Sequence, residues 1–364
     1  MVTALIFIAV LFVLILVHEW GHYITAKKTG MRVDEFGIGF PPKLFGIKKG
    51  ETEYSLNALP IGGFVRIYGE DPTRVGDDPD AARAFSARPR WAQAVVLVAG
   101  VVMNILLAWV LFIFVFMSGV PSAVDEAVAG PDAALRVVEI VPDSPLAGQV
   151  PMQAEILAIS SEAERVTDLT PSQLTEFVGR TGEQPITVEF VVGDAPLQTV
   201  TVTPSTQVLA GEPDRVAIGL STVMVEVQQY GFVEAVVGAT AQTWNTLRLI
   251  VVSIAGLLYN TATGTADFSQ VAGPIGIFNL VGDAASVGLV SLLMFTAVIS
   301  LNLAIINLFP FPALDGGRLI FVAIEAVIRR PIDPIWTARL NLVGFFILIA
   351  LMVAVTYKDI LDIT

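Results

Sequence analysis

The chain has 364 residues, of which 54% are hydrophobic and only 15% charged, and its mean hydropathy is +0.71. This composition indicates a membrane protein. The absence of cysteine excludes disulfides, thiolate metal sites and a cysteine nucleophile. The net charge of −13 gives no indication of a nucleic-acid partner, so none is expected.

An apolar run over residues 4–17 opens the chain, and we expect a first membrane span over 1–26. No basic residue precedes the run and no small-residue cleavage site follows it. This pattern favours a retained span over a signal peptide. Three further apolar stretches predict spans over 93–119, 287–317 and 340–357.

Residues 27–92 are too polar to cross a membrane, and we expect them to form a cytoplasmic segment. Within it, 57–71 alternates apolar and polar residues around Pro60 and two glycines, which predicts a short hairpin or β-loop. Residues 72–90 are rich in Asp, Pro and Arg and indicate a loop with little structure. A second cytoplasmic loop is expected over 318–339, between the last two spans.

Residues 130–222 contain four β-type runs separated by Pro and Gly turns, with a helical stretch at about 170–179. They predict a small α+β domain. Residues 231–265 are helical in period and moderately apolar, but carry Gln242, Asn245 and Arg248. We expect an amphipathic helix on the membrane surface, with a fifth span as the alternative.

The charges predict the orientation of the spans. Residues 27–92 hold 11 of the 21 basic residues, and 318–339 hold four more, whereas 120–230 have 16 acidic residues against four basic ones. The positive-inside rule therefore puts 27–92 and 318–339 in the cytoplasm. With four spans, both termini and the α+β domain then lie outside.

The sequence His18-Glu19-Trp-Gly-His22 stands at the end of the first apolar run and contains the only two histidines of the chain. Four residues apart on a helix, His18 and His22 share one face and can bind a single Zn²⁺. Glu19 can accept a proton from water that the ion acidifies. Ionisable groups at membrane depth are functional by default, so we interpret the motif as a catalytic zinc site.

A catalytic zinc needs a third protein ligand, which here must be a carboxylate. The strongest candidate is Asp315, in "NLFPFPALDGGRL" after the third span. Pro310 and Pro312 cannot continue a helix, and Gly316 and Gly317 permit tight backbone geometry behind the ligand. The alternative is a proline-rich span terminus that carries only a capping Asp.

The topology of the spans favours Asp315 as a zinc ligand over Asp315 as a helix cap. The first and third spans both run from outside to inside, so His18 and Asp315 arrive in the cytoplasmic half of the bilayer, where they can meet. Asn302 and Asn307 are polar residues in the apolar third span and are expected to face the bundle interior. Of the two, Asn307 is expected to reach the site.

With HEWGH in a first span and N-x-x-P-x-P-x-L-D-G after a third, the chain resembles the site-2 protease family of intramembrane zinc metalloproteases, in particular its bacterial regulator-of-sigma-E branch. The resemblance implies a multi-pass protein of the bacterial plasma membrane. It implies zinc held by His18, His22 and Asp315, with Glu19 as general base. It also implies hydrolysis within transmembrane helices of single-span proteins, such as anti-sigma factors or remnant signal peptides.

Two further segments resemble family elements. "LPIGGFVRIYGE" resembles the membrane-associated β-hairpin that presents a strand edge to substrate, which implies substrate contacts for Gly62, Gly63 and Phe64. Residues 130–222 resemble a PDZ domain, although "QAEILAIS" replaces the usual Gly-Asp-x-Ile. "VAGPIGIF" (271–278) is another shared segment, to which we assign no chemistry beyond a loop that starts a helix.

Two alternatives remain from the residues alone. A zinc-binding scaffold that does not cleave would have no use for Glu19 as a base. A metal transporter would need ligands along a path and often has repeated topology, whereas this chain has one cluster and no repeat.

Overall fold

The computed structural model describes residues 2–70, 79–142, 144–193, 195–206, 208, 215–265 and 272–363. The chain divides into two compact units. The helical unit comprises Met1–Phe114, Val236–Ala285 and Ser291–Thr364, and the sheet unit comprises Val115–Ala235 and Ser286–Val290.

Five helices within the described residues are long and apolar enough to cross a membrane. They are α1 (Val2–Lys28), α2 (Arg90–Ser118), α4 (Phe232–Thr263), α6 (Leu289–Leu308) and α8 (Pro334–Ile363). Four of them coincide with the predicted spans, and α4 is the fifth.

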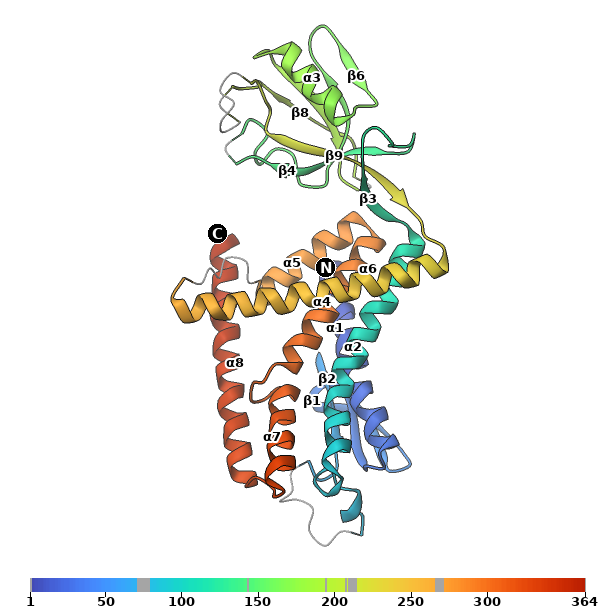
Figure 1. The fold of residues 1–364 in the computed structure, drawn as a ribbon, viewed down its shortest axis with the longest axis vertical. Coiled ribbons are helices and arrows are strands. Elements are labelled where there is room, and N and C mark those ends of the chain that lie inside the picture. The colour runs from blue at the N-terminus through green and yellow to red at the C-terminus, as the bar shows by residue number, and fades with distance from the viewer. Residues whose placement is uncertain are drawn as a thin grey trace. The chain divides into compact units, whose positions relative to one another are not determined.

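The helix predicted over 231–265 is confirmed as α4, a single helix of 32 residues. Figure 1 shows that α4 runs across the direction of α2 and α8, which are roughly parallel to each other. This direction favours a placement of α4 along the bilayer, as predicted, over a fifth span. Its length and composition alone would still allow a span, so the surface placement stays a prediction.

A long antiparallel hairpin of β1 (Val33–Lys49) and β2 (Thr52–Ile67) follows α1. The chain reverses at Gly50 (φ +67°) and again between residues 57 and 63, because 53–56 run parallel to 35–38 whereas 63–66 run antiparallel to the same residues. The β-loop predicted within 57–71 coincides with this second reversal, although its two arms do not pair with each other, because residues 35–38 lie between them.

The loop predicted over 72–90 lies partly outside the described residues, which resume at residue 79. From there the chain forms two short 3₁₀ turns, η2 (Ala81–Arg83) and η3 (Phe85–Ala87), and enters α2. Phe85 is buried against the ends of α1 and α2, so this part of the segment is more ordered than its composition indicates.

The third span ends as expected, because α6 stops at Leu308 before the two prolines. The prediction of a loop over 318–339 is wrong: α7 (Asp315–Ile328) occupies its first half, and α8 begins at Pro334. The sequence after Asp315 is apolar at helical spacing and buries Val322, and Arg329 ends the helix in the left-handed conformation (φ +56°).

The segment 271–278 starts a helix, as expected, although Val271 lies outside the described residues. Helix α5 (Pro274–Val287) begins there. The Asp359 carboxylate of α8 accepts hydrogen bonds from the backbone N–H groups of Gly273 (3.0 Å) and Gly276 (2.8 Å). Asp359 thus caps the first turn of α5 from another helix.

The sheet unit is an α+β domain with its own apolar core, as predicted, but it is wider than 130–222. Its strands are β3 (Val120–Val124), β4 (Ala134–Ile140), β5 (Glu155–Ser160), β6 (Arg165–Thr167), β7 (Ile186–Val191), β8 (Gln198–Val202) and β9 (Leu220–Gln228). The order along the sheet is β3-β9-β4-β5-β7-β8, with β6 beside β5.

The outermost strand β3 and the long β9 lie partly or wholly beyond the predicted limits. The predicted helix is α3 (Pro171–Thr181), which the Thr170 side chain caps by accepting from the Gln173 N–H (3.3 Å).

Candidate metal centre

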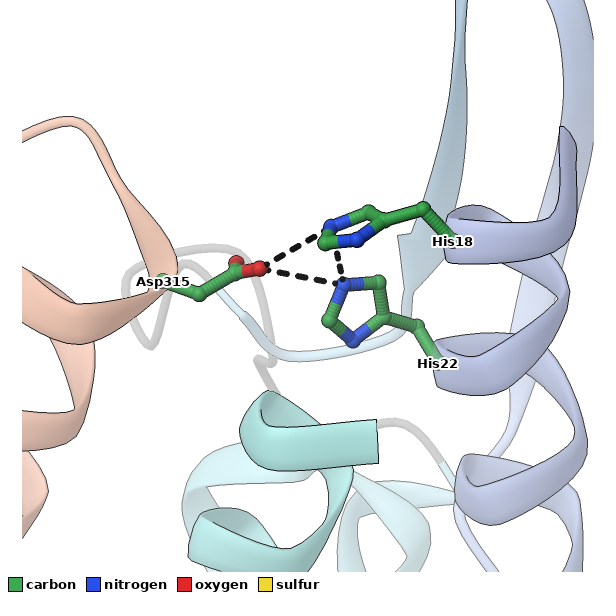
Figure 2. A group of neighbouring side chains, drawn as sticks. All are labelled: His18, His22 and Asp315. Atoms are coloured by element: carbon green, nitrogen blue, oxygen red, sulfur yellow. Dashed lines mark hydrogen bonds and ion pairs between the residues drawn. The ribbon is translucent and has the colours of Figure 1, made fainter. Parts of the chain in front are cut away.

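The site begins with the two histidines of α1. His18 and His22 lie one turn apart on one face of the helix, both are buried, and their Nε2 atoms are 3.1 Å from each other. Figure 2 shows both imidazoles pointing away from α1 toward the start of α7. The predicted sharing of one face is confirmed.

Asp315 completes the cluster from a position 297 residues after His18. Its Oδ2 atom lies 3.1 Å from His18 Nε2 and 3.2 Å from His22 Nε2. The structure therefore brings together the three residues that the sequence predicted as ligands. One ligand atom from each of these two histidines and the aspartate lies within 4.8 Å of the others, so the three side chains could hold one metal ion.

The break between α6 and α7 places the carboxylate. Added Cβ atoms would lie 2.2 Å from the Leu308 oxygen at Gly316 and 2.2 Å from the Phe311 oxygen at Gly317, so only glycine permits this path. The Ala313 N–H donates to Asn341 Oδ1 of α8 (3.3 Å). A neighbouring helix thereby satisfies one of the backbone groups that the break leaves without a helical partner.

The spacing of the three donor atoms fits zinc. Tetrahedral bonds of about 2.0–2.2 Å to nitrogen and oxygen put neighbouring ligand atoms roughly 3.3–3.6 Å apart. The observed separations of 3.1–3.2 Å are slightly shorter and need only a small outward movement. Two imidazoles and one carboxylate are also the ligand set of many catalytic zinc sites, which keep a fourth position open.

A contact from α2 orients one imidazole. His22 Nδ1 lies 2.8 Å from the Val96 carbonyl oxygen, which has no proton, so Nδ1–H donates to it. The proton on Nδ1 leaves the Nε2 lone pair free to face the cluster. This is the usual way in which proteins fix the tautomer of a metal-binding histidine.

A cavity of about 310 Å³ opens beside the three donor atoms. Its wall includes Glu19, Phe64 and Asn307 in addition to the three clustered residues. Gly62 and Gly63 do not line this cavity but a narrow crevice beside it, which Glu19 also lines. Asn302 is absent from the described wall, and its Nδ2 donates to the Val298 carbonyl of its own helix (3.0 Å).

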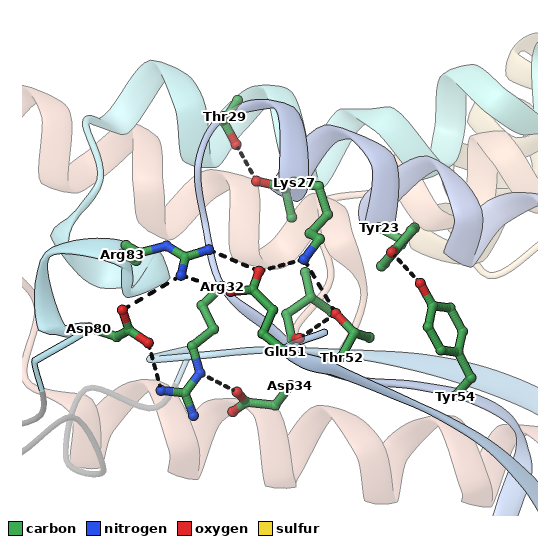
Figure 3. Close-up of polar contacts among 12 residues, drawn as sticks. Tyr23, Lys27, Thr29, Arg32, Asp34, Glu51, Thr52, Tyr54, Asp80 and Arg83 are labelled. Carbon is green, nitrogen blue, oxygen red and sulfur yellow. Dashed lines mark hydrogen bonds and ion pairs between the residues drawn. The ribbon is translucent and has the colours of Figure 1, made fainter. Parts of the chain in front are cut away.

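A polar network attaches the hairpin to the end of α1 (Figure 3). The Glu51 carboxylate, at the hairpin turn, pairs with Lys27 of α1 and with Arg83 Nη1 (2.7 Å). Hydrogen bonds from these two cations lower the pKa of Glu51 from its ordinary 4.5 to about 2. Arg32 extends the network, with Nε 2.8 Å from Asp34 and Nη1 3.2 Å from Asp80.

Sequence reasoning missed the contribution of α2 and an ion pair at the cavity wall. Val96 and Asn104 face the two histidines, and Arg318 pairs with Glu70 (2.7 Å). Asn104 was detectable as the only amide side chain in the apolar run 95–117, whereas the carbonyl of Val96 has no sequence signal.

The chain belongs to peptidase family M50, whose family model matches residues 6–351. It is 37% identical to a putative zinc metalloprotease of Clostridium perfringens, over 96% of this chain and 95% of that protein. It is 30% identical to the zinc metalloprotease RasP of Oceanobacillus iheyensis, over 99% of both chains. A putative zinc metalloprotease of Rhizobium meliloti is 30% identical over 97% of this chain.

These findings confirm the predicted membership of the site-2 protease family, regulator-of-sigma-E branch. The protein is a bacterial zinc metalloendopeptidase with several helices of membrane-spanning length. Its cofactor is zinc.

Proposed function

We propose that this protease hydrolyses peptide bonds within the transmembrane segments of single-span membrane proteins. The observation that carries the proposal is the cluster of His18, His22 and Asp315 beside a cavity that Glu19 lines, in a unit whose long helices are apolar enough to cross a membrane. A peptide bond at this depth is reachable only by a protease that keeps water in a protein-lined cavity.

In this proposal His18, His22 and Asp315 hold the zinc, leaving the cavity side open to substrate. When bound, zinc polarises a carbonyl and lowers the pKa of water. Glu19 accepts a proton from the attacking water while the water oxygen forms a bond to the scissile carbonyl carbon. The carbon–nitrogen bond then breaks, and the proton from Glu19 goes to the leaving amine.

The hairpin is proposed to hold the substrate as an added strand. Residues 63–67 pair with 33–38, and no pairing on their other edge is found among the described residues. Phe64, Val65 and Ile67 line the cavity. An unpaired strand edge beside the site offers backbone hydrogen bonds to an unwound substrate segment, with Gly62, Gly63 and Phe64 in contact and Asn307 reaching the substrate from the opposite wall.

Cleavage of a tagged single-span substrate, followed on gels, tests the proposal. Glu19→Gln keeps the size of the side chain but cannot accept the proton, so we expect cleavage to fall by about 10²–10⁴-fold. Glu176→Gln, on the exposed face of α3, is the matched control and should leave cleavage unchanged. A chelator should abolish the wild-type cleavage and added zinc should restore it.

Identical product bands for wild type and Glu19→Gln, insensitive to chelator, would contradict the proposal. A protein that bound the tagged substrate without cutting it would instead be the zinc-binding scaffold considered above.

A further inference from the structure

Helix α2 presents one face to both histidines. Val96, Gly100 and Asn104 follow one another at intervals of four residues and therefore lie along one side of the helix. The Val96 carbonyl accepts from His22, and Asn104 lies beside His18. Gly100 stands between them, where an added Cβ would be 2.5 Å from His22 Nε2 and 2.7 Å from His18 Cε1.

The Asn104 side chain is completely buried and only partly satisfied. Its Nδ2 atom is 3.4 Å from His18 Nδ1. Its Oδ1 atom has no hydrogen-bond partner among the described residues. A buried amide oxygen without a donor costs free energy, so this atom calls for an explanation.

The backbone around Asn104 is held in place independently of its side chain. Ser300 Oγ of α6 donates to the Asn104 carbonyl (2.8 Å), and both residues are fully buried. The side-chain amide can therefore turn about its own axis at a fixed distance from His18. Half a turn exchanges Oδ1 and Nδ2 and moves no other atom.

The chemistry of His18 decides which of the two atoms faces it. Its Nε2 atom points at His22 and Asp315, so zinc binding there uses the Nε2 lone pair and leaves the ring proton on Nδ1. An N–H group cannot donate to the Nδ2 amino group, whereas Oδ1 can accept from it. The carbonyl oxygen is the atom that the zinc-bound state requires.

We propose that Asn104 is a positioning residue for the zinc site, whose Oδ1 accepts the Nδ1–H of His18 when zinc is bound. This inference rests on the ligand assignment made under Proposed function. Helix α2 then supplies one acceptor to each histidine, the Val96 carbonyl to His22 and the Asn104 amide to His18. Loss of such an outer partner typically weakens metal binding by about 10–100-fold.

Zinc affinity of the full-length protein in detergent, measured by competition with a chromophoric chelator, tests the inference. Asn104→Leu removes the acceptor at similar size and should raise the zinc dissociation constant by about 10–100-fold. Asn104→Asp keeps an acceptor at the same position and should stay within about threefold of wild type. Asn302→Leu, which removes an amide that donates to the Val298 carbonyl of its own helix α6, should bind zinc as wild type does.

Melting of the zinc-free proteins, followed by circular dichroism, separates positioning from folding: a positioning role predicts a lower zinc affinity at an unchanged melting temperature. If Asn104→Leu aggregates, Asn104→Ala takes its place, and its zinc dissociation constant should likewise rise at least about tenfold. Wild-type zinc affinity in the variant without an acceptor would overturn the inference, and so would equal losses in the Leu and Asp variants.

His22→Phe distinguishes this inference from the ligand assignment on which it rests. If His22→Phe binds zinc as wild type does, the ligand assignment itself fails. If His22→Phe loses zinc while Asn104→Leu keeps it, only the role of Asn104 is wrong.

Discussion

At the scale of single residues, the close approach of α1 and α2 controls the geometry of the zinc site. An added Cβ at Gly21 of α1 would lie 2.5 Å from the Ala99 carbonyl oxygen, and one at Gly100 would lie 2.5 Å from His22 Nε2. Both helices therefore need glycine where the imidazoles lie between them. Close packing against α2 thus holds the histidines in addition to their hydrogen bonds.

Gly100→Ala should disturb the metal site without a change of charge. The methyl group must displace the His22 ring, and an overpacking cost of about 1–3 kcal/mol corresponds to roughly 5–150-fold weaker zinc binding. Gly256→Ala is the control, because no atom lies within 4 Å of the added Cβ there. The zinc content of the two variants after dialysis is the measurement. Equal zinc retention by Gly100→Ala and Gly256→Ala would show that α2 has room for the methyl group.

The residues that meet in the site were predictable to different degrees. His18 and His22 share a face because their spacing is a property of any helix, and Asp315 was identified as the available carboxylate after a proline break. Asn104 and the Val96 carbonyl were not predicted, because their roles depend on the register between α1 and α2. No local sequence pattern encodes that register.

At the scale of elements, the hairpin reaches the cavity only if it is fixed to α1. Part of that attachment is the ion network at its turn, where Glu51 pairs with Lys27 and Arg83. A second polar contact lies within the hairpin, where the buried Glu35 carboxylate accepts from Ser55 Oγ (2.5 Å) and pairs with Arg66 (3.0 Å). The ion network at Glu51 and the contacts of Glu35 thus both help to fix the strand edge beside the cavity.

Glu51→Gln should lower the melting temperature by roughly 1–4 °C at pH 7, as expected for a partly exposed pair. The pKa of Glu51 is lowered to about 2, so its contribution is complete above pH 4.5 and is lost as the pH falls toward 2. The gap between the two melting temperatures should therefore be constant above pH 5 and narrow below pH 4.5. Circular dichroism in detergent measures it; a gap that widens on acidification would contradict this account.

Element types were more predictable than their limits. The four spans and α3 follow from apolar run length and from a capping signal. The reversal around Pro60 and Gly62 was predictable from these turn-forming residues, whereas the pairing of 35–38 with both 53–56 and 63–66 was not, because it joins residues that are distant in the sequence. Helix α7 was missed because the charges around 318–339 indicated a loop, although its apolar positions have helical spacing.

At the scale of the whole molecule, we propose that both termini and the sheet unit are extracytoplasmic and that the zinc site lies in the cytoplasmic half of the bilayer. The proposal is supported by the concentration of basic residues in 27–92 and of acidic residues in 120–230. It requires α4 to lie on the membrane surface, because a fifth span would put the two termini on opposite sides.

The absence of cysteine makes this orientation directly measurable. Single cysteines placed at Lys49, exposed in the hairpin, and at Glu176, exposed in the sheet unit, report on the two sides. In intact spheroplasts a membrane-impermeant maleimide should label only the Glu176→Cys protein, and lysis should expose Lys49→Cys as well. Labelling of Lys49→Cys before lysis would show that the hairpin lies outside and would contradict the proposed orientation.

The position of zinc in a crystal of the protein, located by anomalous scattering at the zinc edge, tests the account most directly. We expect one peak within about 2.0–2.2 Å of His18 Nε2, His22 Nε2 and an Asp315 carboxylate oxygen. A peak bound to the two imidazoles with Asp315 beyond bonding distance, or a peak elsewhere in the chain, would contradict a centre built from α1 and α7.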